Sequence, residues 1–302
     1  MAVRHYYGNH HRQYIHVLEY DPKVKNTIIT IHGGGWVSHY EFAIDFLPFA
    51  QGINYETNVF SIDYRLSAGH HSPIDIIDPV EDYVREPYHL IDILHGFQYI
   101  LDNFNIERLS LLGHSVGSFM TLQFQNFLEV IPPGLSELVK HGIITEEEEK
   151  NQLIFIHEFA NQYIPKLDLV NVFYVCGVCD IPSALHTSRE VFKHGEREAN
   201  GFCYIEDVFV SPKHYTESSP VTSTLIKSPF SMIKSKGKHV AFQTVHDEFV
   251  YYDQPLSFIK WFNSLQKPLE FHLEDFGKHH KILTDTKFFS IISRALNETK
   301  DL

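Results

Sequence analysis

The sequence predicts an α/β fold built on a mostly parallel, doubly wound sheet. Seven short runs rich in β-branched and aromatic residues recur along the chain, and segments with apolar residues at helical spacing fall between them. The runs are 14–20, 27–31, 58–64, 108–112, 170–175, 239–246 and 269–274. Strands that alternate with helices pair in parallel, and ligands then bind beyond the carboxyl ends of those strands.

Helical spacing predicts one helix within 78–104 and another that opens at Ser115 and continues through Phe127. Two stretches, 131–166 and 181–236, interrupt the alternation of strands and helices. We expect the second stretch to be partly helical and to cover the site as a cap. A chain of 302 residues with 43% hydrophobic content can bury a large core, so we predict a single α/β domain with insertions near these two stretches.

The first insertion contains a helix start. Thr145 followed by Glu148 has the capping-box pattern, in which each side chain accepts the backbone N–H of the other residue. The acidic run 146–149 suits a first helical turn, where the helix dipole favours negative charge. We therefore predict a helix that begins just after Thr145.

Charge and hydropathy exclude two classes of partner. A formal net charge of −13 argues against nucleic acid, which requires a basic surface. No segment reaches the ~18 consecutive apolar residues of a membrane-spanning helix, and the N-terminal segment is too polar for a secretory signal peptide. We expect a soluble cytoplasmic protein and leave its oligomeric state open, a homodimer included.

The cysteines and histidines do not form a metal-binding pattern. Three cysteines, Cys176, Cys179 and Cys203, suit a reducing compartment better than a disulfide framework. The first two have C-x-x-C spacing without a second pair, and we interpret 171–179 as a buried strand. The 21 histidines lack the spacing of H-E-x-x-H or of a zinc finger. We predict no metal and no cofactor, and expect most histidines at the surface.

The segment 111–117, L-L-G-H-S-V-G, contains G-x-S-x-G directly after an apolar run. Between a strand and a helix, this pattern places the serine on a sharp, strained turn with an accessible hydroxyl. Ser115 is therefore the candidate nucleophile, and the backbone N–H of Val116 is a candidate oxyanion donor. The motif alone also occurs by chance.

The segment 27–36, T-I-I-T-I-H-G-G-G-W, is a β-branched run that ends in a histidine and three glycines. Glycines let backbone N–H groups approach a substrate oxygen, so Gly34 and Gly35 are candidate oxyanion donors; an ordinary glycine loop is the alternative. The glycines precede Ser115 by about 80 residues, and each motif follows a predicted strand. This order predicts a serine hydrolase with the α/β-hydrolase fold.

A carboxylate is expected between the serine and a later histidine, because α/β-hydrolases use the chain order Ser, Asp or Glu, His. The apolar strand within 240–250 leads to Asp247, which is the first choice. Glu248 points the other way if the strand geometry persists, and Asp253 lies further into the next helix. The alternative role for Asp247 is to cap a helix that begins near Phe249.

For the base, a late strand ends in a turn glycine followed by His279 and His280. A histidine takes the serine proton, and a carboxylate fixes its tautomer. His279 lies 32 residues after Asp247 (279 minus 247), which leaves room for one helix and one strand. General acid–base chemistry allows either histidine. His272 lies inside the strand and is expected to be a packed residue.

The segment H-G-G-G-W at 32–36 resembles the H-G-G-x-W signature of arylformamidases, also called kynurenine formamidases, in the hormone-sensitive-lipase-like branch of α/β-hydrolases. Further segments follow in the family's order across nearly the whole chain, which resembles the fungal form. They are 59–67, 113–117, 176–181, 245–248 and 276–280. The pentapeptide is fairly specific, whereas G-x-S-x-G occurs throughout the wider esterase branch.

The resemblance implies hydrolysis of the small molecule N-formyl-L-kynurenine to L-kynurenine and formate, the second step of tryptophan breakdown toward NAD. It favours His279 over His280 as the base. The roles that it implies are nucleophile Ser115, triad acid Asp247, base His279 and oxyanion donors Gly34, Gly35 and Val116. His32, Gly33 and Trp36 belong to the signature, and Trp36 fits a pocket wall and a core anchor equally well.

Two alternatives stay open. A general short-chain carboxylesterase would use the same triad with a wider acyl pocket, and pocket width cannot be read from sequence. A catalytically inactive hydrolase-fold protein would act as a binding module, although such proteins usually lose a triad member and all three candidates are present here. The acidic insertion within 131–166 departs from the short fungal pattern, so the cap shape and the substrate range stay undefined.

Overall fold

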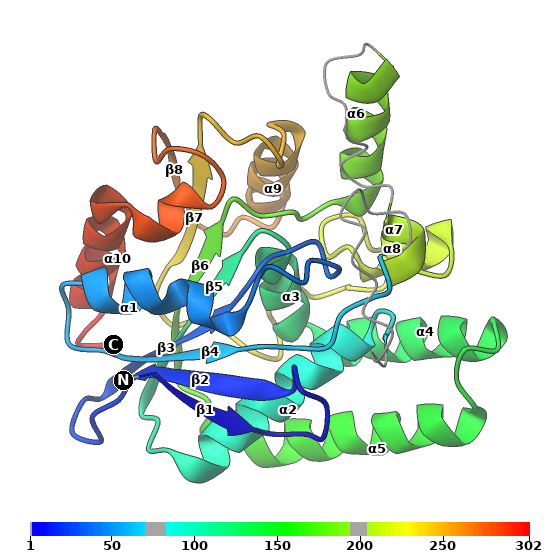
Figure 1. Cartoon of the computed structure of the whole chain (residues 1–302), viewed down its shortest axis with the longest axis horizontal. Coiled ribbons are helices and arrows are strands. Elements are labelled where there is room, and N and C mark those ends of the chain that lie inside the picture. The colour runs from blue at the N-terminus through cyan, green and yellow to red at the C-terminus, as the bar shows by residue number, and fades with distance from the viewer. Residues whose placement is uncertain (1, 70–82, 194–203) are drawn as a thin grey trace.

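The computed structural model describes residues 2–69, 83–193 and 204–302, and eight strands in these residues form one sheet (Figure 1). The strands are β1 (Val3–Tyr6), β2 (Tyr14–Glu19), β3 (Asn26–Ile31), β4 (Asn58–Ile62), β5 (Arg108–His114), β6 (Leu169–Val175), β7 (His239–Thr244) and β8 (Glu270–Glu274). Their order is β1-β2-β4-β3-β5-β6-β7-β8. The pairs β1–β2 and β2–β4 are antiparallel, and all later pairs are parallel.

Each of the seven predicted strand runs overlaps a strand of this sheet, which confirms the predicted mostly parallel architecture. The eighth strand, β1, is absent from the prediction because its four residues are largely exposed and carry no apolar run. The predicted ends of four runs are wrong. β2 ends at Glu19, one residue before its predicted end, and β5 continues to His114, two residues beyond its predicted end. β4 ends at Ile62 and β7 ends at Thr244, two residues before each predicted end. The early end of β7 redirects the side chains that follow it.

Helices cover both faces of the sheet. On one face lie α2 (Tyr88–Asn103), α3 (Val116–Phe124) and α9 (Asp253–Ser264), with α4 (Phe127–Lys140) and α5 (Glu146–Tyr163) packed outside α2 and α3. On the other face lie α1 (Leu47–Gly52) and α10 (Thr286–Glu298). The remaining helical segments are α6 (Ile181–Lys193), α7 (Ile205–Val208), α8 (Pro212–Ser218), and the 3-10 turns η1 (Ala43–Phe46), η2 (Ile164–Lys166) and η3 (Lys281–Thr284).

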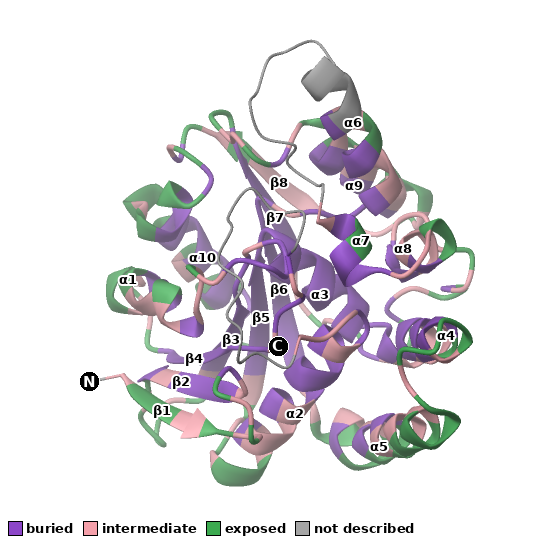
Figure 2. Cartoon of the chain, turned by 45° about the vertical axis from the view of Figure 1, so that its right-hand side comes forward, coloured by how far each residue is buried: buried purple, intermediate pink, exposed green. Residues whose placement is uncertain are grey.

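Alternation along the central strands divides the core between the two faces. In β3, Ile29 and Ile31 pack on the side of α2 and α3, whereas Ile28 packs on the side of α1 and α10. In β5, Leu111 and Leu112 divide in the same way. Figure 2 shows the central strands buried and the outer surfaces of the helices exposed. Strands covered on both faces must be apolar on both faces, which explains their continuous apolar runs.

The predicted helices differ from the observed ones at their ends. A helix is predicted within 78–104, and the observed helix α2 begins at Tyr88. Residues 78–82 lie outside the described residues. One helix is predicted from Ser115 through Phe127, but the structure has two, because α3 ends at Phe124 and α4 begins at Phe127. The amide side chain of Asn126 donates to the carbonyl of Leu122 at 2.9 Å and satisfies a group at the end of α3.

The predicted capping box is present at the start of α5. The backbone N–H of Thr145 donates to Glu148 Oε2 at 2.8 Å, and the N–H of Glu148 donates to Thr145 Oγ1 at 3.1 Å. Phe159 of α5 is buried against the core, while the acidic first turn is largely exposed. The stretch 131–166 therefore contains most of α4 and the whole of α5 and η2, with α5 packed beside α4. No helix among the described residues combines the length and hydropathy needed to cross a bilayer.

Candidate active site

Ser115 lies at the junction of β5 and α3 with φ 57° and ψ −123°, a conformation that L-residues rarely adopt. Its backbone N–H donates to the carbonyl of Val175 at 2.8 Å, and its own carbonyl accepts from the N–H of Ser118 at 3.0 Å. Such backbone strain persists only where the surrounding structure enforces it. The sequence-predicted nucleophile is thus on a sharp strand-to-helix turn.

The two glycines of the motif make this turn possible. A Cβ atom on Gly117 would lie 2.1 Å from the carbonyl oxygen of Ile31, and a Cβ atom on Gly113 would lie 2.2 Å from the carbonyl oxygen of Gly117. Both distances are far below van der Waals contact. The turn therefore packs backbone against backbone, and G-x-S-x-G is the pattern that this packing requires.

The glycine loop after β3 lies directly against this turn. A Cβ atom on Gly33 would lie 2.8 Å from Ser115 Cβ, so no larger residue fits between them. Gly34 and Gly35 have φ angles of 94° and 59°, which glycine adopts without the Cβ penalty. Val116 is the first residue of α3, so its N–H has no acceptor within the helix. The three predicted oxyanion donors thus lie on the two segments that adjoin Ser115.

The second insertion reaches the same loop. A Cβ atom on Gly35 would lie 2.4 Å from the hydroxyl of Tyr204, which precedes α7. Tyr204 therefore packs on the glycine loop from the cap side. The described part of the stretch 181–236 is partly helical, as predicted, and this contact brings it to the candidate site.

Asp247 and His279 form a buried pair. Nδ1 of His279 lies 2.9 Å and 3.0 Å from the two carboxylate oxygens of Asp247, and both side chains are 2% exposed. Burial acts to raise the pKa of Asp247, but the hydrogen bond from His279 and the backbone N–H donors outweigh it and lower the pKa below its usual value. The bond to Nδ1 leaves Nε2 of His279 as the nitrogen available to a nucleophile.

Asp247 does not cap a helix. The next helix, α9, begins only at Asp253, and Asp247 Oδ1 instead accepts the N–H groups of Phe249 at 2.9 Å and Val250 at 2.8 Å. Gln243 also donates to Asp247 Oδ2 at 3.0 Å. A carboxylate with this many donors is held as an anion beside His279.

The expectation that Glu248 points away from the site is wrong. β7 ends at Thr244, so the alternation of a strand no longer sets the direction of Glu248. Its carboxylate accepts the backbone N–H of His279 at 3.0 Å. Sequence reasoning missed this contact because it extended the strand geometry too far.

His114, the residue before Ser115, binds the backbone carbonyl of His279. Its Nε2 lies 3.1 Å from the carbonyl oxygen of His279, and an acceptor there requires that Nε2 carries the proton. Burial lowers the pKa of His114 well below its usual value, so the ring is neutral near pH 7. The ring, the N–H and the carbonyl of His279 are therefore each bound by a different side chain.

The other residues considered for the triad lie in different surroundings. His280 is 48% exposed and pairs with Glu41 at 3.7 Å. His272 stacks on Phe242 with ring centroids 5.3 Å apart, and Asp253 binds the hydroxyl of Ser183 at 2.7 Å. The prediction of a packed His272 is therefore confirmed. The hydrogen bonds described for Ser115 are made by its backbone, and catalytic bonds to the hydroxyl often tighten only when substrate binds.

Trp36 is fully buried beneath the glycine loop. Its ring packs edge-on against Phe119 and Phe209, with centroids 5.4 Å and 5.7 Å away. Of the two roles considered for Trp36, this position fits the core anchor. Its φ of 63° shows that the loop keeps a strained turn at this residue too.

A buried ionic group supports the glycine loop and was not predicted. His32 stacks on Tyr64 with ring centroids 4.3 Å apart, and its Nε2 lies 3.7 Å from Asp63. Asp63 also accepts from Arg12 at 2.8 Å. Burial opposes ionisation of Asp63, but His32 and Arg12 outweigh it and lower its pKa to about 2. The signature histidine thus anchors the loop rather than facing the nucleophile.

The cysteines lie after a strand rather than within one. β6 ends at Val175, so the interpretation of 171–179 as one continuous strand is wrong at its end. Cys176 and Cys179 are buried free thiols, and burial raises the pKa of both well above its usual value. Protonated thiols are poor nucleophiles and poor metal ligands. Cys203 lies outside the described residues.

Eleven of the 18 histidines among the described residues are exposed or partly exposed, in line with the expectation that most histidines lie at the surface. Seven histidines among the described residues are buried: His16, His32, His89, His114, His214, His239 and His279. Three of them belong to the two site motifs or the base loop. Aromatic stacking and hydrogen bonds to buried partners compensate for the loss of solvent at several of these rings.

Comparisons with known proteins show which proteins the chain resembles in sequence and in fold. No family model matches the chain. The kynurenine formamidase of Scheffersomyces stipitis is 27% identical over 92% of this chain and 92% of its own length. The enzyme of Debaryomyces hansenii is 24% identical over 91% of this chain and 93% of its own length. The enzyme of Meyerozyma guilliermondii is 24% identical over 98% of this chain and 93% of its own length.

Two solved esterases share the fold. Esterase B from Lactobacillus rhamnosis superposes with a TM-score of 0.62 and 15% identity over 100% of this chain and 88% of its own. A hyperthermophilic esterase from Pyrobaculum calidifontis superposes with a TM-score of 0.60 and 12% identity over 96% of this chain and 81% of its own. The chain therefore has the predicted α/β-hydrolase fold, and it resembles fungal kynurenine formamidases along nearly its whole length.

Proposed function

We propose that the chain hydrolyses N-formyl-L-kynurenine to L-kynurenine and formate, a step of tryptophan breakdown toward NAD. The observation that carries this proposal is the similarity to three relatives named kynurenine formamidase, each along more than nine-tenths of this chain. The candidate site supports it with a serine on a strained turn, a glycine loop against that serine and a buried Asp247–His279 pair. None of these groups needs a cofactor.

The reaction would begin at Ser115. His279 Nε2 takes the proton of the Ser115 hydroxyl as the oxygen attacks the formyl carbon, and Asp247 stabilises the resulting imidazolium through Nδ1. The lowered pKa of Asp247 keeps its carboxylate charged for this purpose. The carbonyl oxygen of the formyl group then carries the negative charge of a tetrahedral intermediate.

Backbone N–H groups of Gly34, Gly35 and Val116 would stabilise that oxyanion. Their segments adjoin Ser115, and donors fixed in place cost no reorganisation when the charge develops. Each such donor contributes about 10²–10³-fold in kcat in a known serine hydrolase. The glycine loop is held rigid from below by Trp36 and by the Arg12–Asp63 pair.

His279 would next donate its proton to the leaving arylamine nitrogen as the C–N bond breaks. The enzyme is left as a formyl ester of Ser115, which a water molecule hydrolyses with His279 again as base, releasing formate. Phe249 is 51% exposed, and its ring centroid lies 5.4 Å from that of His279. This ring offers an aromatic surface to the aryl leaving group.

A general short-chain carboxylesterase is the second candidate function. It is favoured by the superposition on two esterases that share the fold of this chain. The same triad would serve, and only the width of the acyl pocket would differ. The two functions therefore make different predictions about acyl-chain length.

The test is a comparison of kcat/KM for N-formylkynurenine, N-acetylkynurenine and p-nitrophenyl esters of increasing chain length. A pocket built around a formyl hydrogen clashes with an added methyl, and a misfit of that size costs about 1–3 kcal/mol, or 10–200-fold. We expect formylkynurenine to be cleaved at least about tenfold faster than acetylkynurenine. Efficient cleavage of medium-chain esters with no action on formylkynurenine would establish the carboxylesterase instead.

We further propose a cytoplasmic location, which the free buried thiols Cys176 and Cys179 support, and a small-molecule substrate without a nucleic-acid or membrane partner. The net charge of −13 also argues against binding to nucleic acid. A homodimer stays a prediction. So does the single domain with insertions near 131–166 and 181–236.

A further inference from the structure

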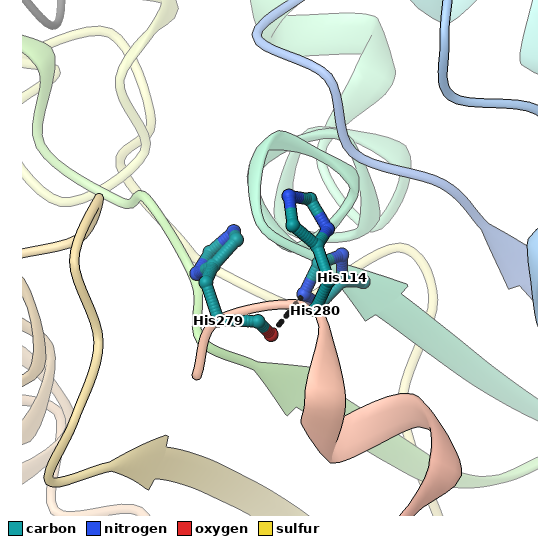
Figure 3. Close-up of side chains that lie close together, drawn as sticks. All are labelled: His114, His279 and His280. Carbon is teal, nitrogen blue, oxygen red and sulfur yellow. Dashed lines mark hydrogen bonds between the residues drawn. The ribbon is translucent and has the colours of Figure 1, made fainter. Parts of the chain in front are cut away.

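Three histidine rings converge beside Ser115, and we propose that His114, His279 and His280 form an inhibitory zinc site. His114 ends β5, while His279 and His280 lie in the loop before η3 (Figure 3). One nitrogen from each ring lies within 4.8 Å of the corresponding nitrogens of the other two. The spacing along the chain gives no sign of this site, because one ligand lies more than 160 residues before the other two.

The ring separations match those of a tetrahedral zinc site. The ring centroids of His114 and His279 are 4.6 Å apart, those of His279 and His280 are 4.9 Å apart, and those of His114 and His280 are 5.5 Å apart. A Zn–N bond of about 2.0–2.1 Å places neighbouring imidazole centres about 5 Å apart in a tetrahedron. The nitrogens must close to about 3.4 Å, and the 48%-exposed His280 has room to turn toward the ion.

The outer contacts of the three rings also suit a metal. Histidines that bind zinc donate their other ring N–H to a carboxylate or a backbone carbonyl. His279 makes such a bond to Asp247, and His114 makes one to the carbonyl of His279. His280 lies 3.7 Å from the carboxylate of Glu41. Two of the three rings are thus already oriented by the kind of partner found around zinc, and a carboxylate lies near the third.

The position of the site makes zinc an inhibitor. A zinc ion bound to Nε2 of His279 occupies the lone pair that takes the Ser115 proton, so the base is lost while the metal stays bound. This consequence rests on the proposed role of His279 in hydrolysis, whereas zinc binding itself does not. Imidazole suits zinc and related transition metals, and Mg²⁺ and Ca²⁺ prefer oxygen ligands. We expect neither Mg²⁺ nor Ca²⁺ to inhibit.

The first experiment measures zinc binding to the full-length protein by titration calorimetry. We expect one ion per chain for the wild type and for Ser115→Ala, since the hydroxyl is not one of the three ligands. His280→Ala removes one ligand and is expected to weaken zinc binding at least about tenfold. His157→Ala, which removes an exposed histidine of α5, is the matched control and is expected to bind zinc like the wild type.

The second experiment measures hydrolysis of p-nitrophenyl acetate in buffered free zinc. His280→Ala should keep the basal rate and require at least about tenfold more zinc for half-inhibition. Equal zinc sensitivity of His280→Ala and the wild type would overturn the site, and so would absence of a one-to-one complex. If His280→Ala does not fold, His280→Gln serves the same comparison.

The outcomes also separate this site from the proposed function. Zinc binding that depends on His280, in a protein inactive on formylkynurenine, would leave the site standing and refute the formamidase. Activity on formylkynurenine that zinc does not affect would do the reverse.

Discussion

The nucleophile side of the candidate site is fixed by backbone that its own short motifs dictate, whereas the base side is fixed by side chains from distant segments. Ser115 sits where Gly113 and Gly117 let the backbone pack closely, and Gly33 lies against it. His279, by contrast, is bound by Asp247, Glu248 and His114. Neighbouring residues in the sequence determine local backbone geometry, but they do not determine hydrogen bonds between distant segments. The two sides should therefore respond differently to substitution.

The largest effect is expected at the two groups that are proposed to exchange a proton. Ser115→Ala and His279→Ala should each lower kcat by about a millionfold, because triad members act as a unit. Circular dichroism should show both variants folded. His280→Ala is the matched control and should change kcat little. A greater loss for His280→Ala than for His279→Ala would transfer the base to His280.

The carboxylate of the base side is expected to matter somewhat less. Asp247→Asn should lower kcat by about 10⁴-fold, because an amide no longer fixes the tautomer of His279 or stabilises its charge. The comparison is with Asp253→Asn, which alters a residue bound to Ser183. Similar small losses in both variants would remove Asp247 from the triad.

Glu248 tests whether a side chain that holds only the backbone of His279 contributes. Glu248→Ala removes a hydrogen bond to a charged group, a loss of about 1.5–3 kcal/mol, and should lower kcat about tenfold or more with little change in KM. Glu248→Gln keeps an acceptor oxygen and should recover most of the rate. Equal rates in Glu248→Ala and the wild type would show that Asp247 and His114 suffice.

On the nucleophile side, the buried Asp63 should affect stability rather than turnover. Its folded pKa of about 2 is below the unfolded value of 3.8, so ionised Asp63 stabilises the fold above pH 4, and this stabilisation is lost as the pH falls toward 2. The shift corresponds to about 2 kcal/mol. Urea unfolding from pH 5 to pH 2 should show a smaller pH dependence for Asp63→Asn. An unchanged slope would exclude this role.

The smallest expected effect is that of metal removal. The proposed triad needs no ion, so exhaustive dialysis against a chelator should leave kcat/KM unchanged or remove bound inhibitor. Activity that is lost on dialysis and restored by zinc would contradict the mechanism and require a catalytic metal. The assay uses the same preparation before and after treatment.

The sequence predicted most of the sheet because parallel strands buried on both faces carry continuous apolar runs. It also predicted the start of α5 from Thr145 and Glu148, since a capping box is a local pattern. β1 escaped notice because an exposed edge strand carries no apolar run. The break between α3 and α4 escaped notice because apolar residues continue across it.

The candidate site divides along the same line. The motifs around Ser115 and Gly34 predict residues that lie together on one side of it, and chain order predicts Asp247 and His279, which pair on the other side. The contacts of Glu248 and His114 could not be predicted, because each depends on where a strand ends and which loop folds back over it. The Arg12–Asp63 pair is missing from the prediction for the same reason, since its partners are 51 residues apart.

The contact between His114 and the carbonyl of His279 has a consequence for protein engineering. Position 114 is the first variable position of G-x-S-x-G, so the motif itself sets no requirement on its side chain. Here that side chain donates a hydrogen bond to the carbonyl of His279, which lies in a loop 165 residues further along the chain. A library that varies residue 114 alone should therefore yield folded but slow enzymes, and recovering their speed will require varying the 276–280 loop in the same library.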